Sequence, residues 1–183
     1  MEFLENYHKS LTIPVPIDLI AERDLRLSII PGHELQKVFG IEGFLSKDCS
    51  SITIDRSVME NRYYRYRFTI AHEIGHLVLH RSLYENAEFE TIEEWIAFTN
   101  QIGAEEYRWA EWQAYRFAGL VLVPVETLHN RFSDAIRKAR NAGFRVEDHF
   151  EEFVEFISRP LSREFDVSTE VIEKQIKLEK LKP

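Results

Sequence analysis

The sequence predicts a single compact α+β domain over residues 1–183. The chain is 44% apolar and 13% aromatic, which is enough to bury a core without cross-links. Its first third alternates short extended patterns with turn residues, whereas apolar residues recur at helical spacing from Tyr64 onward. No internal repeat, low-complexity tract or flexible linker divides the chain. We therefore expect a small N-terminal sheet followed by several helices in one domain.

The N-terminal third predicts one helix and a small sheet. Residues 16–22 are typical of a short helix that carries a proline in its first turn. Residues 25–30 form an extended stretch, and residues 51–55 alternate apolar and polar side chains, as a half-buried strand does. Gly40 and Gly43 bracket a turn between them.

Four helices are predicted in the rest of the chain, at residues 64–80, 104–122, 125–142 and 146–158. The second is unusually apolar and carries Trp109 and Trp112, so we expect it to be central. Gly143 is a typical C-cap for the third helix, and Pro160 marks the end of the fourth. The acidic, aromatic stretch at residues 83–100 is assigned to no element and has the length to shape or cover a cleft.

The C-terminal segment, residues 159–183, has the outline of a helix-turn-helix. A short helix is followed by a tight turn at residues 166–168 and by a second helix that begins near Ser168. A helix that reads DNA needs basic and amide side chains at its start, whereas Glu170 and Glu173 place acid there. We therefore expect this segment to pack on the rest of the domain.

Composition excludes several classes of function. A net charge of -8 disfavours direct nucleic-acid binding, because proteins that bind phosphate backbones carry a basic surface. Cys49 is the single cysteine, and the first residues lack the basic start and apolar stretch of a signal peptide, so we expect a cytoplasmic protein. The longest apolar run, residues 117–125, is far shorter than the roughly 20 residues that span a membrane.

The motif at residues 72–76 carries the chemistry. His72 and His76 lie four residues apart in the first long predicted helix, so both imidazoles can reach one zinc ion from the same face. Glu73 projects beside that face, where it can reach a water molecule rather than the metal. Zinc lowers the pKa of a bound water toward about 7, and a nearby carboxylate accepts its proton during attack on a carbonyl.

A catalytic zinc site needs a third protein ligand. Glu111 is the main candidate, because it lies in the middle of the apolar second helix, where an unpaired carboxylate would be costly to bury. Glu105 and Glu106 are more typical of first-turn charges that favour the helix dipole. His80 extends the histidine face by one turn, so it is a candidate for a role beside the metal, a role in binding substrate, or a plain surface histidine.

These residues resemble the ImmA/IrrE family of metallopeptidases. The run Arg67-Phe-Thr-Ile-Ala leads into the His72-Glu-Ile-Gly-His motif, and Glu111-Trp-Gln-Ala-Tyr-Arg-Phe-Ala follows in a second helix that closes at Pro124. The resemblance covers about residues 14–125, and Tyr115 stands where the family usually has asparagine. It implies a zincin-like α+β core, one zinc ion per chain held by His72, His76 and Glu111, and Glu73 as the catalytic base.

The resemblance also implies a function. Family members act on transcriptional repressors with helix-turn-helix domains, so we expect a zinc-dependent endopeptidase that makes limited cuts in such a repressor. The alternative is a non-catalytic, metal-binding regulator that acts by binding protein or DNA. The intact Glu73 favours the enzyme, since a binding module does not need the base.

Substrate contacts are expected along one predicted strand and at an oxyanion donor. In zincin-like folds the strand beside the motif helix often binds substrate by strand addition, and residues 51–55 are the candidate. The oxyanion needs a donor, for which Tyr107, Tyr115 and His80 are candidates among which the sequence does not choose. The predicted substrate-binding residues are Ile52, Thr53, Ile54, His80 and Tyr115.

Overall fold

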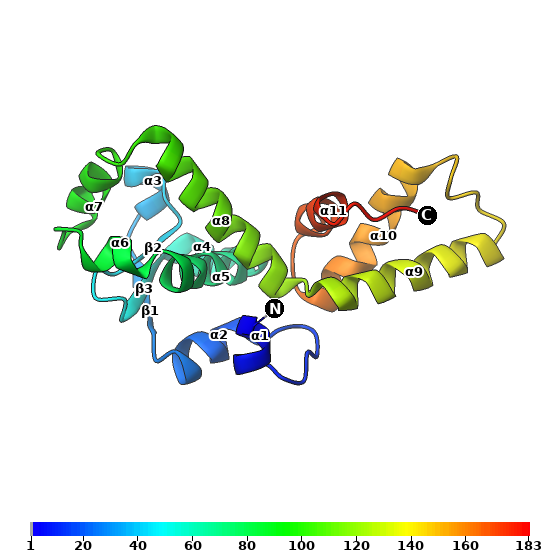
Figure 1. The fold of residues 1–183 in the computed structure, drawn as a ribbon, viewed down its shortest axis with the longest axis horizontal. Coiled ribbons are helices and arrows are strands. Elements are labelled where there is room, and N and C mark those ends of the chain that lie inside the picture. Colours follow the sequence, from blue (N-terminus) through cyan, green and yellow to red (C-terminus); the bar gives the residue numbers. More distant parts are fainter. Residues whose placement is uncertain (1) are drawn as a thin grey trace. The chain divides into compact units, whose positions relative to one another are not determined.

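The computed structural model describes residues 2–183, so Met1 lies outside the described part of the chain. It confirms the α+β class, with one small sheet and many helices (Figure 1). The chain divides into two compact units. The site unit is Pro16–Ala118, and the helical unit is Gly119–Pro183 together with the residues up to Val15. That the whole chain forms one domain stays a prediction.

The site unit contains the sheet, the motif helix and several shorter elements. Its elements in chain order are α2 (Ile17–Leu19), the π-helical turn Ile20–Asp24, β1 (Ser28–Gly32), α3 (Leu35–Phe39), β2 (Gly43–Leu45), β3 (Ser51–Asp55), α4 (Arg56–Asn61), α5 (Tyr63–Leu79), α6 (Arg81–Glu85), α7 (Ile92–Thr99) and the first part of α8 (Ala104–Leu122). The helix predicted at 16–22 and the strands predicted near 25–30 and 51–55 are thus present, with a third strand near Gly43.

The strand order of the sheet is β1-β3-β2. β3 pairs in parallel with β1 and antiparallel with β2, and its residues Ile52 and Ile54 are fully buried. The prediction of strand addition along residues 51–55 is therefore wrong, because both backbone edges of β3 are already paired. The alternation of apolar residues predicted a strand correctly, but it contains no information on which strand lies at the edge.

The motif helix α5 packs on the sheet, and nine of its residues between Arg67 and His76 are buried. Gly75 allows α8 to approach closely, since a β-carbon built there would lie 3.0 Å from the Ala114 Cα and 3.1 Å from the Ala114 carbonyl oxygen. Trp109 and Trp112 of α8 stack on each other with ring centroids 4.7 Å apart and are about half exposed. They therefore lie outside the buried face of α8, to which Ala114, Phe117 and Ala118 contribute in the site unit.

The unassigned stretch at residues 83–100 forms α6, a short connection and α7. α7 begins with a capping box in which the Thr91 side chain accepts from the Glu94 amide, and the Glu94 carboxylate accepts from the Thr91 amide. The stretch buries three aromatic side chains, those of Tyr84, Phe89 and Trp95. It is therefore part of the core of the site unit rather than a surface insertion.

The helical unit contains α1 (Glu2–Tyr7), the end of α8, α9 (Val125–Asn141), α10 (Phe150–Phe165) and α11 (Thr169–Leu178). Gly143 adopts φ +81° after α9, which confirms the predicted cap. Asp166 (φ 53°) ends α10, the Ser168 hydroxyl caps α11, and the two helices contact each other. The first helix of the segment predicted at 159–183 is the end of α10 and not a separate short helix, and that this segment forms a helix-turn-helix-like unit stays a prediction.

The predicted break before Pro160 is wrong, because α10 runs through this residue to Phe165. Phe153, Ile157, Leu161 and Phe165 keep the four-residue spacing of one buried face across the proline. Pro160 lies on the exposed side of α10. It has no N–H to donate to the carbonyl one turn before it, and that carbonyl can bond to water instead. Burial of the apolar face outweighs the loss of one helical hydrogen bond.

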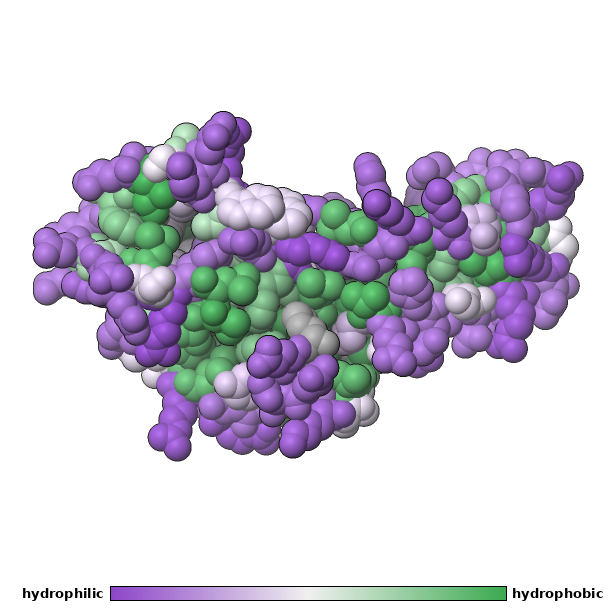
Figure 2. All heavy atoms as spheres, viewed as in Figure 1, coloured by the Kyte–Doolittle hydropathy of each residue, from purple (hydrophilic) through white to green (hydrophobic). Residues whose placement is uncertain are grey.

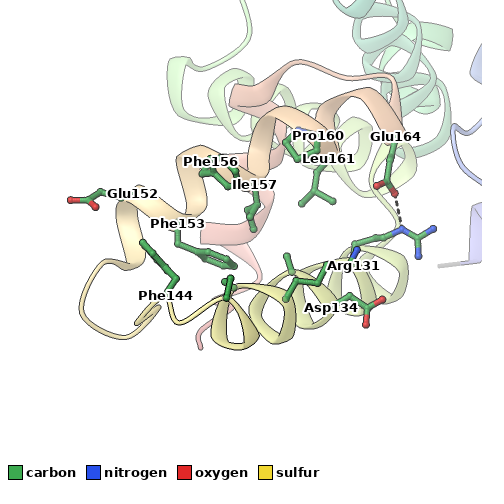
Figure 3. A pocket seen from close by; sticks show the side chains of 14 residues that line it. Arg131, Asp134, Phe144, Glu152, Phe153, Phe156, Ile157, Pro160, Leu161 and Glu164 are labelled. Carbon is green, nitrogen blue, oxygen red and sulfur yellow. Dashed lines mark hydrogen bonds and ion pairs between the residues drawn. The ribbon is translucent and has the colours of Figure 1, made fainter.

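A groove of about 810 Å³ runs between α9 and α10 in the helical unit (Figure 3). Alanines of α9 line one side and aromatic residues of α10 the other, including Phe156, which is 77% exposed. Arg131 of α9 and Glu164 of α10 form an ion pair at one end. Hydrophilic residues cover most of this region on the face shown in Figure 2, with hydrophobic residues visible between them. No helix among residues 2–183 is long and apolar enough to span a membrane.

Candidate metal centre and active site

Two histidines of α5 face the same point. His72 and His76 are separated by one helical turn, and their Nε2 atoms lie 3.1 Å apart. The His76 side chain is 6% exposed and that of His72 is 18% exposed. Both imidazoles are therefore held in a partly dry environment with their Nε2 atoms together.

Glu111 of α8 completes the group. Its Oε2 lies 3.3 Å from His72 Nε2, and its Oε1 lies 3.3 Å from His76 Nε2. One ligand atom from each residue can be chosen so that all lie within 4.8 Å of one another. The close crossing of α5 and α8 at Gly75 and Ala114 brings this carboxylate to the histidines. The tryptophans beside Glu111 are exposed, so its placement comes from this crossing rather than from burial between them.

The electrostatics of the group fit a cation. Burial alone would raise the pKa of Glu111, but hydrogen bonds from His72 and His76 outweigh it and lower that pKa. Burial also opposes charge on His72, yet its hydrogen bond to Glu111 and the negative charges of Glu73 and Glu111 raise the pKa of His72. Two imidazole nitrogens and one carboxylate are the donor set of a catalytic zinc site with an open position. The residues present therefore fit a divalent transition metal.

Glu73 lies beside this group, where α5 packs against β2. It is 5% exposed, and burial raises its pKa, as does the charge of Glu111 to a smaller extent. The Leu45 backbone amide of β2 hydrogen-bonds to the Glu73 carboxylate. Gly43 allows β2 to lie this close, because a β-carbon there would be 2.6 Å from Thr69 Cγ2 and 3.7 Å from Glu73 Oε1.

A cleft of about 370 Å³ opens over the four residues. Its walls come from α5, α8, α7 and the segment before β2, and they combine aromatic with charged side chains. The lining residues that belong to these walls include Ile41, Glu42, Gly43, Arg65, Phe68, Trp95, Tyr107 and Tyr115.

Comparison with known proteins identifies the family. The family model of the IrrE N-terminal-like domain, a peptidase family, matches residues 56–177. The chain belongs to the IrrE N-terminal-like peptidase family. The match continues through most of α11, further toward the C-terminus than the resemblance in sequence motifs, and it begins at α4.

One solved structure with a similar fold is a Mycobacterium tuberculosis transcriptional regulator, at 17% identity and a TM-score of 0.51. The similarity covers 92% of this chain and 42% of the regulator chain, so this chain spans less than half of the regulator's length. At this identity the comparison shows a shared fold and nothing about substrate. No protein of curated function matches the sequence.

The other predicted site residues of this IrrE-like chain lie in different surroundings. Tyr115 lines the cleft, and its ring packs on Phe68 with centroids 4.7 Å apart. His80 lies behind the histidine pair and not among the residues that line the cleft. Its Nδ1 is 3.1 Å from His76 Nδ1, and its Nε2 is 3.0 Å from Gln113 Oε1. Burial lowers the pKa of His80.

The remaining candidate for an oxyanion donor is Tyr107, which lines the cleft one turn before Glu111 and hydrogen-bonds to it. Burial, with the charge of Glu111, raises the pKa of Tyr107, so the phenol remains a hydrogen-bond donor. The wall of the cleft that α8 forms therefore carries an uncharged hydrogen-bond donor, the phenol of Tyr107.

Sequence reasoning missed two aromatic residues of the unassigned stretch. Tyr84 is 4% exposed, and its ring centroid is 6.1 Å from that of His76. Trp95 lines the cleft, and its side chain hydrogen-bonds to the Tyr84 hydroxyl. Burial raises the pKa of Tyr84 well above its usual range. The threonine and glutamate of the capping box, Thr91 and Glu94, were the available sequence signal for the helix that carries Trp95.

Proposed function

We propose that the protein is a cytoplasmic zinc-dependent endopeptidase that makes limited regulatory cuts in a helix-turn-helix transcriptional repressor. The observation that carries this proposal is the buried carboxylate of Glu73 beside the three convergent ligand atoms of His72, His76 and Glu111. A site that only binds a metal would need the carboxylate of Glu111 but not that of Glu73, because burying a carboxylate that does not coordinate the metal is costly. Membership of a peptidase family supports the same reading.

The chain's own residues divide the chemistry among them. A zinc ion held by His72, His76 and Glu111 would supply Lewis acidity for activating water and polarising a carbonyl. Glu73 accepts the proton of the attacking water and passes it to the leaving amine. Its raised pKa makes it a stronger proton acceptor than an exposed glutamate. Tyr107 lies at the wall of the cleft as a candidate donor to the developing oxyanion, a role for which its single phenol hydrogen has to leave Glu111.

The substrate backbone is proposed to lie along β2 rather than β3. β2 pairs with β3 on one side only in the described sheet. Glu42 and Ser46 direct their backbone groups to β3, so by alternation those of Gly43 and Leu45 face the other way. The Leu45 amide is engaged by Glu73, and Gly43 lines the cleft. An extended peptide paired with Gly43 would therefore cross the site next to the base.

A repressor is the proposed substrate for two reasons. The sequence motifs resemble a family whose members act on transcriptional repressors, and the family model matches residues 56–177. The net charge of -8 would also favour encounter with the basic surface of a DNA-binding partner. The contact that selects the bond lies in the cleft, whereas this long-range attraction mainly increases the rate of encounter.

The alternative function is a non-catalytic regulator that binds protein or DNA through α10 and α11. The helix-turn-helix outline of these helices is the observation that favours it. Glu170 and Glu173 lie in the first half of α11, where a DNA-reading helix would carry basic or amide side chains, and this weighs against DNA as the ligand.

Replacing Glu73 with glutamine separates the two functions. Glu73→Gln keeps the shape of the side chain and removes the proton acceptor, so we expect zinc content and folding to be unchanged. Peptide-bond hydrolysis should fall by about 10² to 10⁴-fold. The matched control is Glu60→Gln, which changes an exposed glutamate of α4.

The assay mixes zinc-loaded protein with candidate helix-turn-helix repressors and follows the products by mass spectrometry. One or very few cuts by the wild type and by Glu60→Gln, and none by Glu73→Gln, would support the proposal. Equal turnover by the two variants would remove Glu73 from the role of base. Rapid cleavage of generic unfolded proteins at many sites would exclude the regulatory function, and binding without cleavage would favour the alternative.

A further inference from the structure

We propose that His80 and Gln113 form a hydrogen-bond relay that fixes the tautomer of His76, so that the Nε2 lone pair of His76 faces the metal position. His80 is then a positioning residue, not a ligand or a substrate contact. The inference rests on the metal centre of the proposed function, and it does not depend on which substrate is cleaved.

The relay begins at Gln113. Its Oε1 is a carbonyl oxygen and can only accept, so the His80 Nε2 atom 3.0 Å away must carry the hydrogen of this bond. A neutral imidazole has one N–H and one lone pair, which leaves the lone pair of His80 on Nδ1. That atom lies 3.1 Å from His76 Nδ1.

The second step sets His76. The short distance between the two Nδ1 atoms requires one donor and one acceptor, and His80 is the acceptor. With a metal in the place of the hydrogen that His76 Nε2 otherwise shares with Glu111, His76 carries its hydrogen on Nδ1 and its lone pair on Nε2. His76 Nε2 is the atom that lies 3.1 Å from His72 Nε2 and 3.3 Å from Glu111 Oε1. The lone pair thus faces the ligand group.

The positions of the two residues in the fold suit this role. His80 is the residue at which α5 ends, one turn beyond His76, and its backbone amide still bonds to the His76 carbonyl at 2.8 Å. Gln113 lies on α8 two residues after Glu111. The relay therefore connects the two helices that supply ligands, on the side away from the cleft.

The geometry argues against the other roles that the sequence left open for His80. A fourth ligand would need a His80 nitrogen near the Nε2 atoms, whereas its Nδ1 contacts the opposite nitrogen of His76. A substrate contact would need His80 at the cleft wall, and it is not among the lining residues. A plain surface histidine would not hold two side-chain hydrogen bonds while half buried.

Partners that hold the second nitrogen of a metal-bound histidine typically change metal affinity by about 10- to 100-fold when they are removed. We therefore expect His80→Leu to weaken zinc binding by about that factor in a chelator competition. His80→Asn should recover most of the affinity, because the asparagine oxygen can occupy the place of Nδ1. Gln113→Leu should weaken binding by a smaller factor, and His33→Leu, at an exposed histidine, should have no effect.

A second measurement reads the tautomer directly. Long-range ¹H–¹⁵N NMR spectra of the metal-free protein, at about pH 8 where an ordinary histidine is neutral, distinguish Nδ1–H from Nε2–H. We expect Nε2–H on His80 in the wild type, because Gln113 accepts that hydrogen with or without metal, and a mixture of the two tautomers on His80 in Gln113→Leu. This test needs neither activity nor zinc.

The outcomes separate the relay from the proposed function. Zinc affinities within twofold of wild type in both His80→Leu and Gln113→Leu, or Nδ1–H on His80 in the metal-free wild type, would overturn the relay. If His80→Leu does not fold, Gln113→Leu and the wild-type spectrum still decide. If the wild type binds no zinc, the proposed function fails, and the tautomer of His80 still decides whether the relay exists.

Discussion

Gly75→Ala tests how closely α5 must approach α8 to bring the ligands together. A β-carbon at residue 75 would lie 3.0 Å from the Ala114 Cα, 3.1 Å from the Ala114 oxygen and 3.2 Å from Phe117 Cδ1. Two of these three atoms belong to the backbone of α8, which cannot rotate away. The two helices would have to separate by a few tenths of an ångström to accept alanine.

Two opposing effects set the expected change in stability. Alanine favours a helix over glycine by about 0.8–1.0 kcal/mol, which stabilises α5. Overpacking a tight contact costs about 1–3 kcal/mol. The net result is a loss in the free energy of unfolding that lies between about zero and 2 kcal/mol. We expect zinc affinity to fall about tenfold, a larger effect than that on stability. The reason is that Glu111 lies one turn before Ala114 on α8, so any separation of the two helices also moves its carboxylate away from the histidines.

Urea unfolding of the metal-free protein and a chelator competition for zinc measure the two effects separately. Phe117→Leu in the Gly75→Ala background is the control. It relieves only the side-chain contact, so it should restore little of either loss. A Gly75→Ala protein that is about 1 kcal/mol more stable than wild type and binds zinc equally well would show that the helices have room for the methyl group, contrary to this prediction.

The remaining predictions concern a ligand and a helix cap. Glu111→Ala should lose zinc to a chelator while Glu105→Ala, at an exposed position of the same helix, retains it, and full zinc content in Glu111→Ala by elemental analysis would contradict the ligand assignment. Asp55→Ala should cost about 2 kcal/mol, because the carboxylate caps α4 through the Ser57 amide at 2.8 Å and accepts from the Gln36 amide at 3.0 Å. Burial alone would raise the pKa of Asp55, but these hydrogen bonds lower it, so the stabilisation should be complete well above pH 4 and decline as the pH falls below it. Urea midpoints at neutral and acidic pH test this, and a loss in Asp55→Ala that does not change with pH would contradict it.

Local patterns in the sequence predicted the elements whose own residues determine them. The helical spacing around the motif predicted α5, and the alternation at residues 51–55 predicted β3. The alternation of β3 arises from one buried face, whereas α5 is buried on nearly every side between Arg67 and His76, so its spacing identified the helix but not the extent of its burial. The break expected before Pro160 failed because the buried face of α10 extends past the proline, and burial in the tertiary structure outweighed a local preference.

Glu111, the expected third ligand, lies beside the histidines for a reason that the sequence does not indicate. The sequence favours Glu111 because it lies in the middle of an apolar helix, yet Trp109 and Trp112 on either side of it are exposed. Its carboxylate reaches the histidines because Gly75 permits a close helix crossing. Hydrophobicity in sequence indicates that a residue tends to be buried, but it does not say against what.

Residue spacing alone is sufficient to place two imidazoles and a neighbouring carboxylate together on one helix, because a four-residue separation fixes their relative positions. The edge strand of the sheet, the positions of Tyr84 and Trp95 beside the site, and the contact of His80 with Gln113 follow from folding and not from any local pattern. Each of these depends on contacts between segments that are far apart in the chain or on the packing of a whole layer. The strength of such contacts depends on shape and distance in the folded state, which no local pattern of residues contains.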